Sequence, residues 1–90
     1  MKQEINVKFK TLEGGNHFIL FNPKLPILDL KKKISWELRV NEENLVIIFR
    51  GKKLLNDLKL TDYDFEEGKT LNVIARQSNL KNNEIESNKI

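Results

Sequence analysis

The sequence predicts a small α+β domain in which a single helix packs against a sheet. Three observations lead to this fold class. Apolar and polar residues alternate near the N-terminus, apolar residues then recur at helical spacing, and two short apolar runs of strand composition follow. Ninety residues, with 39% hydrophobic and 32% charged residues, suit one soluble globular domain.

The first two elements are predicted to form a β-hairpin. Residues 5 to 12, INVKFKTL, alternate apolar and polar side chains, which is the period of a half-buried strand. Gly14 and Gly15 follow, and glycine readily adopts the positive φ angles of hairpin turns. Residues 17 to 21, HFILF, then form the returning strand.

After this hairpin the apolar period changes to that of a helix. Apolar residues recur at spacings that line one helical face: Ile27, Leu30, Ile34 and Leu38. Pro26 fits the first turn, where a missing N–H costs nothing, and Asp29 complements the positive end of the helix dipole. A helix is therefore expected over residues 27 to 38.

The second half of the chain supplies the remaining strands. Residues 45 to 49, LVIIF, and residues 70 to 75 have strand length and composition, and Gly51 fits a tight connection. The stretch between them holds residues that could pack against the core: Leu54, Leu60, Tyr63 and Phe65. Because hydrophobic periodicity ends after Gln77, we expect a domain over residues 1–77 and a disordered tail or linker start over 78–90.

Five segments in this order resemble ubiquitin and its ubiquitin-like relatives: FKTLEGG, the helix, IIFRGKKL, LTDYDF and TLNVIAR. The match runs from Ile5 to about Gln77 without insertion or deletion. This resemblance implies the β-grasp fold, a mixed sheet of about five strands wrapped round one helix. It also implies a structural role for Tyr63, through a hydrogen bond from its phenol.

The residue inventory argues against an enzyme. Without Cys, disulfides and thiolate metal sites are excluded, and His17 alone cannot build a histidine metal cluster. We find no nucleophile with a neighbouring base, no acid/base carboxylate pair and no phosphate-binding glycine loop. His17 is interpreted as a partly buried sheet residue. A binding module without cofactors is therefore expected.

Targeting signals are also missing from the sequence. No apolar run approaches the roughly 20 residues that cross a bilayer, and the N-terminus lacks the apolar core of a signal peptide. The cytoplasm or the nucleus is the expected compartment, and no membrane partner is expected.

The resemblance also implies where partners bind, because the family recognises them through an exposed apolar patch. The aligned residues here are Leu12, Ile48 and Ile74, and strand alternation independently turns Ile48 and Ile74 outward if their neighbours face the core. The full predicted surface is Leu12, Ile48, Ile74, Lys10, Arg50, Gly51, Lys52, Asn72 and Arg76. An apolar centre with a basic rim suits a partner helix with small apolar residues flanked by acidic ones.

The C-terminal sequence separates this chain from conjugated modifiers, which end in Gly-Gly. Gln77 and Ser78 follow Arg76 where the glycines should stand. The sequence therefore predicts a monomeric, non-conjugated docking domain, similar to those at the N-terminus of ubiquilin-type shuttle factors or scythe-like chaperone scaffolds. Its expected partners are proteasome ubiquitin-receptor subunits, ubiquitin-interacting motifs or ubiquitin-associated domains, in protein quality control.

The sequence allows two alternative functions, and four of its apolar residues have two possible roles. Lys31-Lys32-Lys33, Lys52-Lys53 and the net charge of +3 are compatible with RNA or another polyanion, although basic and acidic residues are interspersed. The domain could instead bind another region of its own protein and hold it inactive. The four apolar residues form either a second contact surface or local packing: Leu28, Trp36, Leu55 and Leu58.

Overall fold

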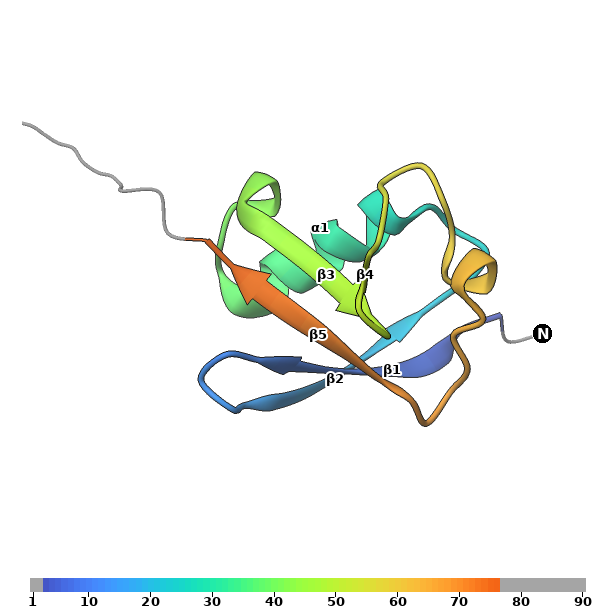
Figure 1. Ribbon diagram of the computed structural model, residues 1–90, viewed down its shortest axis with the longest axis horizontal. Helices are drawn as coiled ribbons and strands as arrows, with labels where there is room; N and C mark the ends of the chain where they lie inside the picture. The colour runs from blue at the N-terminus through green and yellow to red at the C-terminus, as the bar shows by residue number, and fades with distance from the viewer. Residues whose placement is uncertain (1–2, 77–90) are drawn as a thin grey trace, which may run out of the picture.

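The computed structural model describes residues 3–76, which form a five-stranded sheet with one α-helix (Figure 1). In chain order the elements are β1 (Ile5–Thr11), β2 (Asn16–Phe21), α1 (Ile27–Leu38), the 3₁₀ helix η1 (Glu42–Asn44), β3 (Leu45–Phe49), β4 (Lys52–Lys53), the 3₁₀ helix η2 (Leu60–Tyr63) and β5 (Thr70–Ala75). The predicted α+β class and β-grasp fold are confirmed. The expected boundary at residue 77 and the tail beyond it lie outside the described residues.

The strands are ordered β2-β1-β5-β3-β4, so the last strand lies in the middle of the sheet (Figure 1). β5 pairs in parallel with β1 and antiparallel with β3, while the two hairpins β1–β2 and β3–β4 form the outer parts. The sheet is therefore mixed, and it holds together only because β5 joins the two hairpins.

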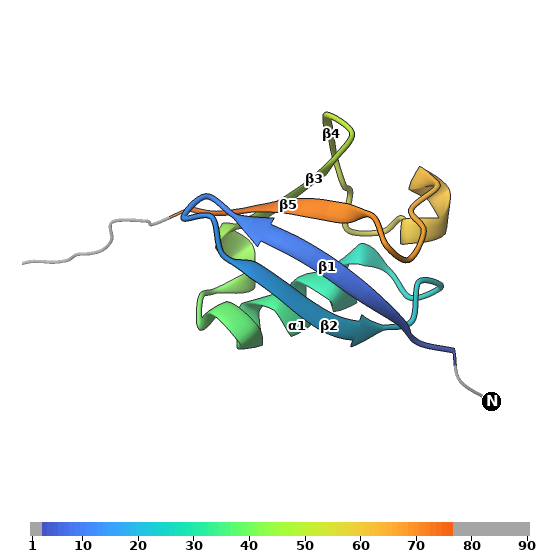
Figure 2. The same ribbon diagram turned by 90° about the horizontal axis from the view of Figure 1, so that it is seen from below.

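α1 packs across one face of this sheet, as the view from below shows (Figure 2). The helical face predicted from the spacing of apolar residues is the buried one, except that Leu38 is only partly buried. The other core residues come from every strand but β4, and from the loop after it: Val7, Phe9, Phe21, Leu45, Ile47, Phe49, Leu54, Leu60, Phe65, Leu71 and Val73. The opposite face of the sheet is left to solvent.

Two hairpin turns show why glycine is needed there. Gly14 adopts φ +90°, and the loop between β3 and β4 has two residues, Arg50 at φ +54° and Gly51 at φ +78°. A two-residue loop with both φ angles positive is the turn that matches the twist of paired strands. The sequence indicated Gly51 for this turn, but not the strained Arg50 beside it.

The ends of α1 differ in detail from the sequence expectation. Pro26 is the N-cap residue, with extended backbone angles, rather than part of the first turn. At the other end Arg39 takes a left-handed conformation, and the N–H of Val40 donates to the carbonyl of Ser35. The polar connection that follows contains η1, whose Asn41 side chain accepts a hydrogen bond from the N–H of Glu43.

Tyr63 has the structural place that the resemblance implied, with one correction. Its phenol oxygen lies 2.9 Å from the backbone nitrogen of Leu55, so the phenol accepts this hydrogen bond rather than donating it. The bond ties η2 to the segment after β4, and the neighbouring apolar residues Leu54, Leu60 and Phe65 are buried. Within residues 3–76, no helix is long and apolar enough to cross a membrane.

Candidate partner-binding surface

Three aliphatic residues from distant parts of the chain meet on the solvent face of the sheet. Leu12 follows β1 in the hairpin loop and is 77% exposed. Ile48 in β3 pairs with Asn72 of β5, and the next outward position of β5 is Ile74, which pairs with Val46. We call Leu12, Ile48 and Ile74 the apolar patch.

The strand alternation explains why these side chains point away from the core. Along β3, residues Leu45, Ile47 and Phe49 are buried, and Ile48 between them is half-buried. Along β5, Leu71 and Val73 are buried, so the intervening side chains face the side of the sheet opposite α1. Asn72 is exposed between the two isoleucine positions.

Four exposed basic residues lie around the apolar patch, and we call Lys10, Arg50, Lys52 and Arg76 the basic rim. Lys10 pairs with Asn72 across the parallel β1–β5 ladder. The guanidinium of Arg50 lies 5.2 Å from the centre of the Phe49 ring, where a cation on an aromatic face is favourable.

The basic rim makes no ion pair within residues 3–76, although Arg50 and Lys52 line a hollow that also contains Asp62 and Asp64. Within residues 3–76 the two ion pairs are His17–Glu37 and Lys33–Glu4, and neither involves the rim. The predicted surface residues come from β1, the β1–β2 loop, β3, the β3–β4 turn that contains Gly51, β4, β5 and the residue after β5. An apolar centre surrounded by positive charge is what an acidic, partly apolar partner needs.

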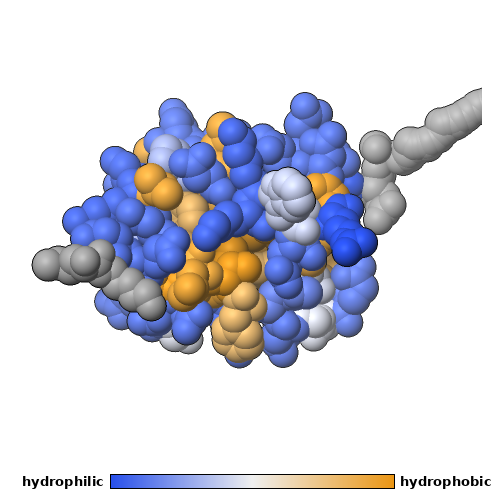
Figure 3. All heavy atoms as spheres, turned by 180° about the vertical axis from the view of Figure 1, so that it is seen from behind, coloured by the Kyte–Doolittle hydropathy of each residue, from blue (hydrophilic) through white to orange (hydrophobic). Residues whose placement is uncertain are grey.

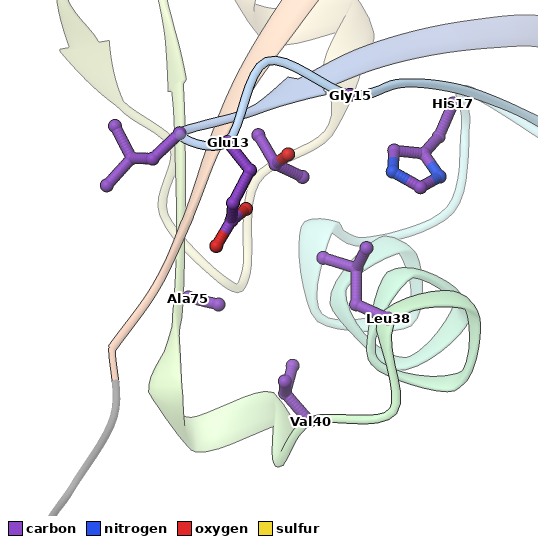
Figure 4. A pocket seen from close by; sticks show the side chains of 8 residues that line it. Glu13, Gly15, His17, Leu38, Val40 and Ala75 are labelled. Carbon is purple, nitrogen blue, oxygen red and sulfur yellow. The ribbon is translucent and has the colours of Figure 1, made fainter.

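A pocket of about 450 Å³ adjoins Leu12 at the end of the sheet from which the chain leaves β5 (Figure 4). Its walls come from the β1–β2 loop, the C-terminal end of α1 and β5: Thr11, Leu12, Glu13, Gly15, His17, Leu38, Val40 and Ala75. The sequence does not predict this pocket, because only the folded hairpin brings Glu13 and His17 close to Leu38 and Val40.

The His17 side chain in this pocket makes packing contacts with its neighbours. The ring of His17 stacks on Phe9 with 4.9 Å between ring centres, and its Nδ1 lies 3.5 Å from a carboxylate oxygen of Glu37. No group of three or more His, Cys, Asp or Glu side chains that could hold a metal ion occurs in the described part of the chain. His17 is half-buried in β2, as the sequence indicated.

The four apolar residues whose role the sequence did not decide do not form one surface. They are Leu28, Trp36, Leu55 and Leu58. The N–H groups of Ile27 and Leu28 bond to the carbonyls of Leu58 and Asn56, which brings the leucines together near the start of α1. Trp36, 85% exposed, follows Leu28 by eight positions, or about 12 Å along a helix. It lines hollows with different residues, among them Leu20 and Val40. Trp36 therefore belongs to a separate surface.

Comparison with known proteins places this arrangement in a family. The family model described as "Ubiquitin family" matches residues 5–78. The chain belongs to the ubiquitin family. Its match to ubiquitin-like protein 4B of Mus musculus is 36% identical over 67 residues, covering 74% of this chain.

Solved structures of ubiquitin-like domains are similar to this ubiquitin-family chain. The crystal structure of the UBL domain of Plasmodium falciparum Dsk2 gives a TM-score of 0.76 at 33% identity, covering 81% of this chain and 99% of that one. The solution structure of the N-terminal ubiquitin-like domain in the 4931431F19Rik protein gives a TM-score of 0.81 at 28% identity. The match covers 91% of this chain and 84% of that one. The chain spans 11% of the length of another relative, ubiquitin-like domain-containing protein CIP73 of Lotus japonicus, and 36% of the length of ubiquitin-like protein 4B.

Proposed function

We propose that this ubiquitin-family domain is a non-catalytic, non-conjugated docking module that binds an acidic, partly apolar helix through the apolar patch. The partner class is that of ubiquitin-interacting motifs, ubiquitin-associated domains and the proteasome receptor subunits that carry such elements. The observation that carries the proposal is the exposed Leu12, which follows Thr11 where β1 pairs with β5, together with Ile48, Ile74 and four exposed basic residues that make no ion pair within residues 3–76. Family membership and the likeness to the UBL domain of Dsk2 support it.

The size of the surface sets the expected affinity. Three aliphatic side chains and a rim of four charges would bury about 400 Å² on each side, in the range of weak and transient interfaces. A dissociation constant of roughly 10–500 μM is expected. Binding of this kind suits a module that delivers its protein to a receptor and then releases it.

Chemical-shift mapping tests this function. The ¹⁵N-labelled domain is titrated with a helical peptide that has alanine and leucine at its centre and glutamates around them. We expect shifts for Leu12, Ile48, Lys52 and Ile74, and a loss of affinity of at least tenfold for Ile48→Ala. The control variant Trp36→Ala loses a larger exposed side chain on the other face, and it should bind the peptide with unchanged affinity. Shifts confined to α1 and β2 would refute the proposal.

The basic rim gives RNA as the second candidate partner, because its four charges and that of Lys53 are exposed. The salt dependence of the affinity distinguishes RNA binding from helix binding at the apolar patch. Binding to phosphates falls steeply between 50 and 200 mM salt, whereas binding centred on the apolar patch should change only a few-fold. A single-stranded RNA oligonucleotide that binds more tightly than the helical peptide, with this steep salt dependence, would favour the RNA function. An autoinhibitory role would instead show as patch shifts caused by the rest of the same protein.

A further inference from the structure

β2 is an outer strand of the sheet, and its free edge is apolar. Phe18 is 62% exposed and Leu20 43% exposed, which is unusual for a strand edge open to water. Figure 3 views the molecule from the side of α1 and shows apolar side chains gathered in its lower half, on the side of β2. This edge lies away from the apolar patch, since β1 and β5 separate β2 from β3.

The hydrogen-bonding groups of this edge follow from the β1–β2 register. The N–H of Thr11 bonds to the carbonyl of Gly15 at the hairpin end, and hydrogen-bonded pairs alternate along an antiparallel ladder. The pairs Phe9–His17 and Val7–Ile19 are therefore bonded internally. The N–H and C=O groups of the alternate residues Asn16, Phe18 and Leu20 point away from β1 and can pair with another strand.

The side chains beside this edge have opposite charges at its two ends. The Nζ of Lys33 donates to the carbonyl of Leu20, while Glu37 lies beside His17, 3.5 Å from its Nδ1. Between them Trp36 forms one wall of a hollow of about 500 Å³, and Ile19 and Leu20 form the other. α1 thus runs antiparallel to β2, with Lys33 and its ion-pair partner Glu4 near Leu20 and with Glu37 near His17.

We propose that this edge pairs with the same edge of a second copy of the chain, around a two-fold axis at Phe18. Phe18 then faces Phe18 of the second copy, and Leu20 faces Asn16, so each outward N–H and C=O finds a partner. The same axis brings Lys33 near Glu37 of the second copy, and Glu37 near its Lys33. Lys33 exchanges the Leu20 carbonyl for a carboxylate, and the two Trp36 side chains fill the space between the helices.

Self-complementarity is the reason for choosing a second copy over another protein. An isologous interface requires one surface to match itself after a two-fold rotation. The edge meets this requirement in both hydrogen bonds and charge. The contact would bury about 800–1,000 Å² in total, near the lower limit for specific interfaces. We therefore expect a monomer at low micromolar concentration and a dimer near 1 mM or at high local concentration.

Sedimentation velocity of the 90-residue chain between 20 μM and 2 mM tests this dimer. We expect the mass to rise toward that of a dimer, with a blue shift of the fluorescence of Trp36, the single tryptophan. Phe18→Pro should abolish both changes while the domain stays folded by circular dichroism, because the N–H of Phe18 does not bond to β1. Leu55→Ala, which truncates an exposed leucine elsewhere, should dimerise normally.

A mixing experiment tests the two-fold axis without relying on the proline variant. Lys33→Glu reverses the charge that faces Glu37 of the second copy, and Glu37→Lys reverses the charge that faces its Lys33, so each variant should dimerise at least tenfold more weakly. A 1:1 mixture should form heterodimers as well as the unmodified chain forms dimers, because every cross-axis pair is then opposite in charge. Lys52→Glu mixed with Glu66→Lys makes the same change of charge away from β2 and should show no gain over the unmodified chain.

Several results would overturn the proposal. The unmodified chain could stay monomeric at 2 mM, or the mixture could fail to associate. Association could also be insensitive to Phe18→Pro and to both charge changes, which would place the contact elsewhere. A monomer whose β2 edge binds an extended peptide of another protein would also refute it. None of these outcomes bears on helix binding at the apolar patch, so the two proposals fail independently.

Discussion

Among single residues, Tyr63 has the clearest expected effect on stability. Tyr63→Phe leaves the packing of the ring in place and removes the oxygen that accepts from the N–H of Leu55. We expect the free energy of unfolding to fall by about 1 kcal/mol, the usual net contribution of one hydrogen bond. Urea denaturation measures this change. An unchanged midpoint would show that water replaces the phenol, and affinity at the apolar patch should be unaffected in either case.

Lys31 has a perturbed pKa. Partial burial lowers its pKa below the ordinary 10.5, the nearby charge of Lys53 lowers it further, and Glu42 acts in the opposite direction. The folded protein thus binds this proton more weakly than the unfolded chain does. The resulting penalty is present at neutral pH and disappears as the pH rises from the lowered pKa through 10.5, so the contribution of Lys31 to stability increases with pH there.

Removal of the charge of Lys53 tests this explanation of the lowered pKa of Lys31. Lys53→Gln should raise the pKa of Lys31 part of the way to its ordinary value, because the repulsion disappears while the burial remains. An NMR titration of the Lys31 side chain measures it. Lys69→Gln removes the same charge from the loop before β5 and should leave the pKa of Lys31 in place. A shift of similar size in both variants would mean that net charge, and not Lys53, sets the pKa.

At the residue scale, the sequence identified the outward positions but could not identify their neighbours. Alternation turned Ile48 and Ile74 away from the core, as the burial of the residues beside them requires. That Ile48 lies opposite Asn72, however, depends on the β3–β5 register, which no local pattern determines. Trp36 illustrates the same limit, since its position off the apolar stripe was evident while its neighbours on β2 were not.

At the scale of elements, α1 shows how strongly burial separates two positions on one helix. Ile34→Ala empties a fully buried position and should lower the free energy of unfolding by about 2–5 kcal/mol. Trp36→Ala, two residues later, removes an exposed ring and should change it by less than about 0.5 kcal/mol. Urea denaturation at low micromolar concentration compares the two. Equal losses would contradict the exposure of Trp36.

The elements with strong periodicity were those predicted with the right limits. The helix Ile27–Leu38 and the strands Leu45–Phe49 and Thr70–Ala75 agree with the structure, because each buries an unambiguous set of apolar side chains. β4 was not identified as a strand. Its residues, Lys52 and Lys53, are both exposed, so it exists only through pairing with β3 and leaves no apolar pattern in the sequence.

At the scale of the whole molecule, the resemblance implied a mixed sheet of about five strands, but the strand order was not predicted. The apolar pattern does not show that β5 pairs in parallel with β1, because a buried central strand has the same pattern whichever strands lie beside it. The order comes from the structure, in which β5 lies between β1 and β3. The contact between the β1–β2 loop and the end of β5, which forms the pocket beside Leu12, follows from that order.

Truncation tests how the whole domain is held together. A fragment of residues 1–77 should unfold cooperatively with the same free energy as the 90-residue chain, because the sequence predicts a domain over residues 1–77 and β5 ends at Ala75. A fragment of residues 1–69 lacks β5 and leaves β1 without its link to β3, so it should show no cooperative transition. Circular dichroism with urea distinguishes them. Cooperative unfolding of the shorter fragment would contradict the central role of β5.

The central place of β5 also has a consequence for how this domain is made. Ribosomes deliver a chain from its N-terminus, at about 5–20 residues per second. Both hairpins and α1 therefore emerge before Thr70–Ala75, the strand that joins them. Until then the nascent chain carries two unsatisfied strand borders, one on β1 and one on β3. A pause in translation between Phe49 and Thr70 would prolong that interval, in which aggregation and chaperones compete with folding.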